Sequence, residues 1–85
     1  MDYKFNDLIN DLNDGREIEF FYKNSHYGIV NRMSDPAWYI CKDNIRISEY
    51  KDNPVDLLEH TKLEGVSLEE IFDNLLYDEN GLCIL

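Results

Sequence analysis

The chain has 85 residues and a formal net charge of −10, which fits one small domain and disfavours direct binding to nucleic acid or to an anionic membrane. Aromatic residues form 13% of the sequence, and each buried ring removes about 150–250 Å² from water. We therefore expect a single ordered α+β domain over residues 1–85, with a thin core.

The spacing of apolar residues predicts a first helix over about residues 3–13. Four apolar side chains would share one face of this helix: Phe5, Leu8, Ile9 and Leu12. We expect the helix to end at residues 13–15, Asn-Asp-Gly. Gly15 can adopt the left-handed backbone conformation that follows many helices.

Two alternating segments, residues 17–22 and 27–32, predict an antiparallel hairpin. We expect Asn24 and Ser25 to form a two-residue turn between them. That register places Phe20 opposite Ile29 and gives the hairpin one apolar face. A slip by one residue would move every apolar side chain to the other face.

A second hairpin is predicted from residues 37–41 and residues 45–50, with a turn at residues 43–44, Asp-Asn. A two-residue turn there places Ile40 opposite Ile47. Together the two hairpins predict a four-stranded antiparallel meander.

Two helices are predicted after the sheet. Asn53 as N-cap and Pro54 at the first helical position begin the first helix. Ser67 and Glu70 form a capping box that begins the second. The second helix carries the strongest apolar stripe of the chain: Leu68, Ile71, Phe72, Leu75 and Leu76. The predicted fold is thus α+β, a four-stranded antiparallel meander with one N-terminal helix and two C-terminal helices.

The last four residues, 82–85, are apolar. We expect them to pack back onto the domain as an added edge strand, and the alternative is an exposed tail. The N-terminal sequence carries no apolar stretch typical of a signal peptide, and no apolar run is long enough to cross a bilayer. We expect a cytoplasmic protein.

The charge is unevenly distributed along the sequence. Residues 16–51, the predicted sheet, carry six basic and five acidic groups, whereas residues 52–85 carry nine acidic groups and one basic group. If the helices lie on one side of the sheet, the molecule has one strongly acidic face. The residues we expect to contact a partner are Asp56, Glu59, Glu69, Glu70 and Asp73. The alternative is a solvated helical surface without a partner.

The sequence offers little for catalysis. His26 and His60 have no His or Cys at metal-ligand spacing, and no phosphate-binding glycine motif or nucleophile elbow occurs. The basic residues of the sheet are scattered, so we expect no nucleic-acid patch. We expect no enzyme, no catalytic residues, no metal and no cofactor. Cys41 and Cys83 are expected as reduced thiols, although one disulfide would also fit.

Four segments of the chain resemble a group of small uncharacterised acidic proteins of low-GC Gram-positive bacteria and their phages and mobile elements. The segments are Arg16–Tyr22, Tyr27–Ile29, Trp38–Cys41 and Gly65–Ile71. The resemblance spans about residues 5–75. It implies an accessory protein of a mobile element, and such proteins include anti-CRISPR and anti-restriction inhibitors that bind a host protein.

Two hypotheses about function follow. In the first, the chain is a non-enzymatic binding protein that occupies a basic surface of a larger protein, one that otherwise binds nucleic acid. In the second, it is a structural or self-associating module that forms a homodimer through the sheet or through residues 82–85.

Overall fold

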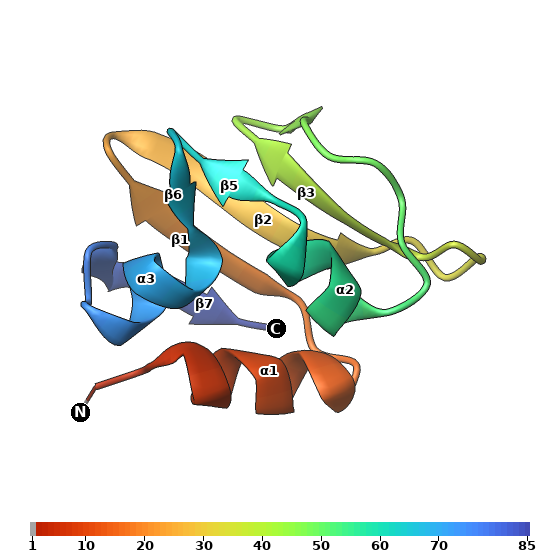
Figure 1. The fold of residues 1–85 in the computed structure, drawn as a ribbon, viewed down its shortest axis with the longest axis horizontal. Coiled ribbons are helices and arrows are strands. Elements are labelled where there is room, and N and C mark those ends of the chain that lie inside the picture. The colour runs from red at the N-terminus through yellow and green to blue at the C-terminus, as the bar shows by residue number, and fades with distance from the viewer. Residues whose placement is uncertain (1) are drawn as a thin grey trace.

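A five-stranded antiparallel sheet carries all three helices on one of its faces (Figure 1). The computed structural model describes residues 2–85. The strand order in the sheet is β4-β3-β2-β1-β7, and β5 and β6 form a separate hairpin over the same face as the helices. The elements are α1 (Phe5–Asn13), β1 (Ile18–Tyr22), β2 (Ser25–Asn31), β3 (Trp38–Lys42), β4 (Ile45–Arg46), α2 (Pro54–Glu59), β5 (Lys62–Leu63), β6 (Val66–Ser67), α3 (Leu68–Asp73) and β7 (Asp78–Ile84).

The sheet has one strand more than the predicted four-stranded meander. The added edge strand is confirmed, and it begins earlier than residue 82, at Asp78. It pairs with β1, with Ile84 opposite Ile18. The early start of β7 shortens α3, which ends at Asp73. Leu75 then adopts a positive φ of 53°, a conformation that a helix cannot contain, so the chain turns back toward the sheet.

The register predicted for the first hairpin is wrong by two residues. Phe20 lies opposite Tyr27, and Ile18 opposite Ile29. The turn is formed by Lys23 and Asn24, whose φ angles are 50° and 64°, as a type I′ turn requires at both central positions. A shift by two residues preserves the faces of both strands, so the predicted apolar face is confirmed.

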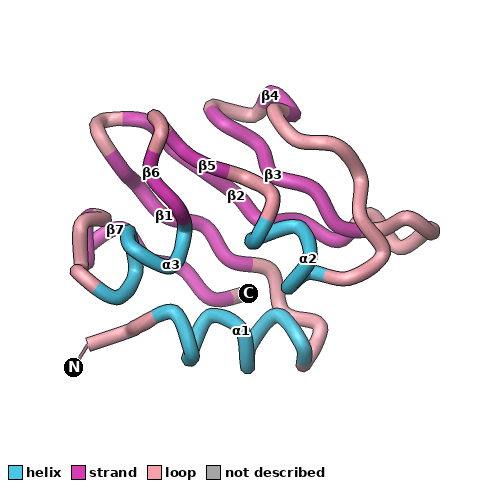
Figure 2. Tube along the Cα trace, viewed as in Figure 1, coloured by secondary structure: helices cyan, strands magenta, loops and turns pink. Residues whose placement is uncertain are grey.

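In the second hairpin the predicted turn and register are confirmed, and the amide of Ile47 donates to the carbonyl of Ile40 at 2.9 Å. The strand β4 is much shorter than predicted. The chain leaves the sheet after Ile47 and returns at Lys51, which pairs with Trp38. We call the segment between Ile47 and Lys51 the β4 bulge. Here the hydroxyl of Ser48 accepts a hydrogen bond from the amide of Ile40 at 2.8 Å, in place of the backbone acceptor that a continuous strand would supply. Figure 2 shows the long connection from β4 to α2.

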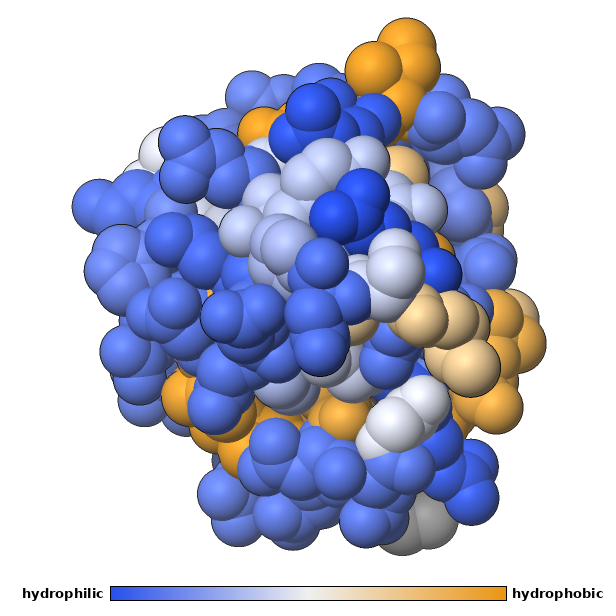
Figure 3. All heavy atoms as spheres, turned by 90° about the vertical axis from the view of Figure 1, so that its right-hand side faces the viewer, coloured by the Kyte–Doolittle hydropathy of each residue, from blue (hydrophilic) through white to orange (hydrophobic). Residues whose placement is uncertain are grey.

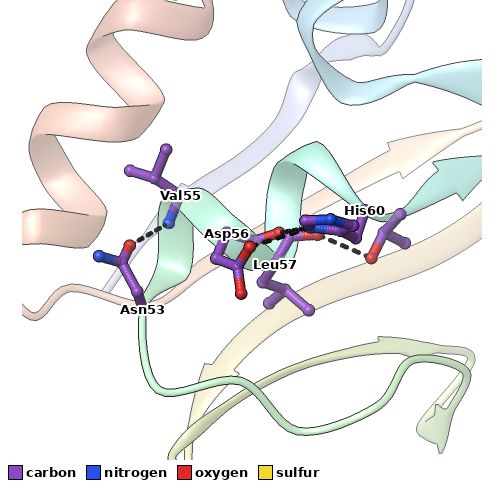
Figure 4. A network of polar contacts seen from close by, with 6 residues as sticks. Asn53, Val55, Asp56, Leu57 and His60 are labelled. Atoms are coloured by element: carbon purple, nitrogen blue, oxygen red, sulfur yellow. Dashed lines mark hydrogen bonds and ion pairs between the residues drawn. The ribbon is translucent and has the colours of Figure 1, made fainter.

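The predicted helix starts after the sheet are also confirmed. The side chain of Asn53 accepts from the amide of Val55 at 2.8 Å (Figure 4). The hydroxyl of Ser67 accepts from the amide of Glu70 at 3.1 Å. Both bonds satisfy amides that have no partner within the helix.

A cluster of four buried rings joins the sheet to α3 and to the segment before β7. Phe72 of α3 lies 5.0 Å from Phe20 of β1 in an edge-to-face arrangement, and 4.6 Å from Tyr77. Phe20 in turn stacks on Tyr27 at 5.6 Å. Each ring is almost completely buried. Such pairs contribute about 0.5–1.5 kcal/mol each beyond the area they bury, so this cluster fixes α3 on the sheet.

Tyrosine hydroxyls tie the N-terminal segment to this cluster. Tyr77 donates to the carbonyl of Tyr3 at 2.6 Å, and the hydroxyl of Tyr3 donates to the carboxylate of Asp11 at 2.6 Å. Burial is the main cause that raises the pKa of Tyr3, Tyr27 and Tyr77, and the hydrogen bond to Asp11 raises that of Tyr3 further.

Replacing Ser48 by alanine removes the side-chain acceptor of the Ile40 amide. We expect a loss of about 1–3 kcal/mol in the free energy of unfolding, because a partly buried donor is left without a partner. The S34A variant is the control, since Ser34 is exposed and its hydroxyl makes no hydrogen bond to the residues described. Urea unfolding of both variants measures the difference, and equal stabilities would contradict the assigned role of Ser48.

The raised tyrosine pKa values predict a loss of stability in alkali. A group whose pKa is higher in the folded protein keeps its full contribution below the unfolded pKa and loses it as the pH rises through the folded pKa. We therefore expect the free energy of unfolding to fall above about pH 10. The Y3F variant should be less stable at neutral pH and should show a shallower alkaline decline. Denaturant titrations at several pH values test both points.

Candidate functional site

The predicted partner-binding residues lie on α2 and α3, which pack against each other on the covered side of the sheet. We call this set the acidic helical surface; it consists of Asp56, Glu59, Glu69, Glu70 and Asp73. The structure brings the five carboxylates onto one layer of the molecule. It does not leave all five free to meet a partner.

Two of the five carboxylates have internal partners. The carboxylate of Asp56 lies 3.0 Å from Nδ1 of His60, one turn later in α2 (Figure 4). Asp73 accepts the backbone amide of Phe5 at 3.1 Å and so links α3 to the start of α1. Glu59, Glu69 and Glu70 are exposed and form no ion pair with any residue from 2 to 85. These three are the carboxylates available for a partner.

The opposite face of the sheet carries no helix. We call it the outer sheet face, and its residues are Glu19, Phe21, His26, Val30, Tyr39, Cys41, Arg46 and Cys83. Most of these side chains are half-buried or exposed. Figure 3 shows the right-hand side of Figure 1 and not the outer sheet face itself; this side of the molecule is mainly hydrophilic, with apolar residues in separate groups.

The structure brings two arginines together beside this face, which the sequence analysis did not predict. The guanidinium carbon of Arg32 lies 3.7 Å from the ring centroid of Tyr50, and that of Arg46 lies 4.5 Å from it. Tyr39 meets Tyr50 edge-to-face at 5.3 Å. No sequence signal could have found this group. Arg32 follows β2, Tyr39 lies on β3, Arg46 lies on β4 and Tyr50 lies between β4 and α2, and only strand pairing places them side by side.

The two histidines each face a carboxylate. Nε2 of His26 lies 3.0 Å from an oxygen of Glu19 on the outer sheet face, and the ring of Phe21 lies 5.2 Å from that of His26. His60 pairs with Asp56 on the other side of the molecule. Among residues 2–85, no three His, Cys, Asp or Glu side chains are grouped so that they could hold a metal ion.

The hollows on the surface of residues 2–85 include the following three. One, of about 380 Å³, lies between the β4 bulge and α2, and its lining includes Lys51, Leu57 and His60. A second of similar volume lies beside α1 and includes Tyr3, Asp11 and Leu82. The third, of about 290 Å³, lies at the β1–β2 turn. In the first hollow His60 is already paired with Asp56, and in the second Tyr3 already donates to Asp11.

The positions of the cysteines exclude a disulfide within the chain, which the sequence left open. Cys41 lies on β3 and Cys83 on β7, and β2 and β1 lie between these strands. Three strand spacings correspond to about 14 Å, whereas the Cα atoms of a disulfide lie within about 7 Å. Both thiols are free.

Comparisons with known proteins give no match. No family model, no curated protein and no solved structure resembles the chain closely enough to count as similar. Within residues 2–85, no helix has the length and apolar character needed to span a bilayer.

The two thiols should differ in reactivity. Cys83 is exposed, whereas Cys41 is half-buried, and burial raises the pKa of the Cys41 thiol more than the nearby Arg46 lowers it. Since the thiolate is the reactive form, we expect iodoacetamide to modify Cys83 first at mildly alkaline pH. Mass spectrometry of peptides over time measures both rates, and faster labelling of Cys41 would contradict the structure.

Proposed function

We propose that the chain is a non-enzymatic binding protein whose acidic helical surface occupies a basic surface of a larger protein. One observation carries the proposal. Glu59, Glu69 and Glu70 are exposed on one layer and without ion-pair partners within residues 2–85, in a segment with a net charge of −8. The partner class is a protein whose basic surface otherwise binds nucleic acid, because arginine and lysine pair with carboxylates much as with phosphates.

The fold supports this use of the helices. The apolar side chains of α2 and α3 are buried beneath them, among them Leu57, Leu58, Ile71 and Phe72, so the helices present carboxylates outward. The excess of negative charge extends over residues 52–85 and would accelerate encounter with a cationic partner. By analogy with small acidic proteins of phages and mobile elements, we propose an inhibitor of a host protein, of the anti-CRISPR or anti-restriction type.

Charge reversal tests the proposal. The protein retained by the immobilised chain from an extract of host cells is purified, and its affinity is measured for the variant Glu59→Lys with Glu69→Lys. Glu59 is the last residue of α2 and Glu69 lies in the first turn of α3, so the effects of the two lysines on the helix dipoles oppose each other. We expect the affinity of the double variant to be roughly tenfold lower than that of the unaltered chain. We also expect the affinity of the unaltered chain to fall as the salt concentration rises to about 0.5 M.

The matched control reverses two acidic residues away from the helices, Asp35→Lys with Glu49→Lys. Both positions are exposed, and the change in net charge is the same. An equal loss of affinity in the control would show that only total charge matters. Affinity that does not depend on salt would also contradict the proposal.

Self-association is a second candidate, favoured by the edge strand β7. It pairs with β1 on one side only, and Ile84 and Leu85 near its end are 39% and 64% exposed. An open edge of this kind can pair with a second copy of the chain. Sedimentation at two concentrations distinguishes the candidates: a dimer that survives high salt favours edge pairing, and a monomer at both concentrations excludes it.

A further inference from the structure

The placement of Arg32 and Arg46 is unusual for so acidic a chain. Eighteen acidic side chains are present, yet neither arginine forms an ion pair with any residue that the structure describes. Both lie over the ring of Tyr50 instead. Since both distances are measured to the same centroid, the two guanidinium carbons are at most 8.2 Å apart, the sum of those distances.

The two guanidinium groups are held in place while most of their donors stay free. Nε of Arg32 donates to the carbonyl of Pro36 at 2.8 Å, and one terminal nitrogen of Arg46 donates to the carbonyl of Ser48. A guanidinium has five N–H groups, so each arginine keeps several for a ligand. Stacking on Tyr50 restrains the side chains before binding, which reduces the entropy lost when a ligand arrives.

The surroundings are mainly apolar, with one carboxylate nearby, that of Glu17, which accepts a hydrogen bond from the amide of Asn31 at 3.0 Å. Tyr39 packs on Tyr50, and Tyr39 and Val30 are opposite each other in the strand pairing of β2 and β3. Cys41 is opposite Arg46. These half-buried side chains on an uncovered sheet offer an apolar surface next to the two positive charges. A ligand that fits here has a negative group beside an apolar one.

We propose that this face binds a peptide segment of a partner protein through a single carboxylate that accepts hydrogen bonds from Arg32 and Arg46 beside Tyr50, with the adjoining apolar side chain of that segment on Tyr39 and Val30. A carboxylate fits because a guanidinium edge can donate two parallel hydrogen bonds to its two oxygens. The net charge of −10 repels ligands that carry many negative charges, such as nucleic acid or an anionic membrane, far more than it repels one carboxylate. This site is separate from the acidic helical surface.

The probe for this site is 3-phenylpropionate, which joins one carboxylate to one ring. We expect saturable changes in the NMR signals of the Arg32 and Arg46 side-chain Nε–H groups and of the Tyr39 and Tyr50 rings, with a Kd on the order of 1–10 mM. The neutral amide of the same compound should produce no saturable change at the arginines. A similar response to the amide would overturn the proposal.

The variant Arg46→Lys keeps the charge and removes the planar group, and we expect it to weaken binding at least fivefold. Arg16→Lys is the matched control, because Arg16 is exposed and stacks on no ring among residues 2–85; its Kd should be unchanged. Equal affinity of R46K and the unaltered chain for 3-phenylpropionate would contradict the proposal. So would tighter binding of inorganic phosphate than of 3-phenylpropionate, since the ligand would then be a phosphoryl group.

Discussion

The contact between Phe20 and Phe72 is the interaction on which the rest of the structure depends. It joins the central part of the sheet to α3, and Tyr77 extends it toward the N-terminal segment. A domain of this size buries only roughly 60% of the surface that its unfolded chain exposes. With so little core available, one buried aromatic cluster holds α3 and the segment before β7 against the apolar face of the sheet.

Because the helices occupy a single face, the molecule has two chemically different sides. On the covered side, α2 and α3 expose carboxylates to solvent. The uncovered side presents apolar residues and two arginines over Tyr50. The asymmetry follows from packing: each short helix buries its apolar stripe inward and turns its acidic residues to solvent. The two binding proposals therefore concern opposite sides of one thin scaffold.

Helix caps and turns, which depend on neighbouring residues, could be predicted from the sequence. Strand register and contacts at the site, which depend on distant residues, could be predicted only in part. The caps at Asn53 and Ser67 and the turn after Lys42 depend on local hydrogen bonds and backbone conformation. The first hairpin was predicted in the wrong register, since Lys23-Asn24 and Asn24-Ser25 are both plausible turns and a two-residue shift preserves the apolar face. Of the acidic site residues, Asp73 proved to be committed to the amide of Phe5, 68 positions away in the sequence.

The sequence by itself determined the α+β class, the faces of the strands and the concentration of negative charge in the helices, because periodicity, caps and composition are properties of short segments. Only the tertiary structure decided that β7 would join β1, that α3 would end at Asp73, and that Arg32 and Arg46 would share the ring of Tyr50. Those outcomes depend on contacts between residues far apart in the chain, where many pairings are compatible with the same local pattern and packing selects one.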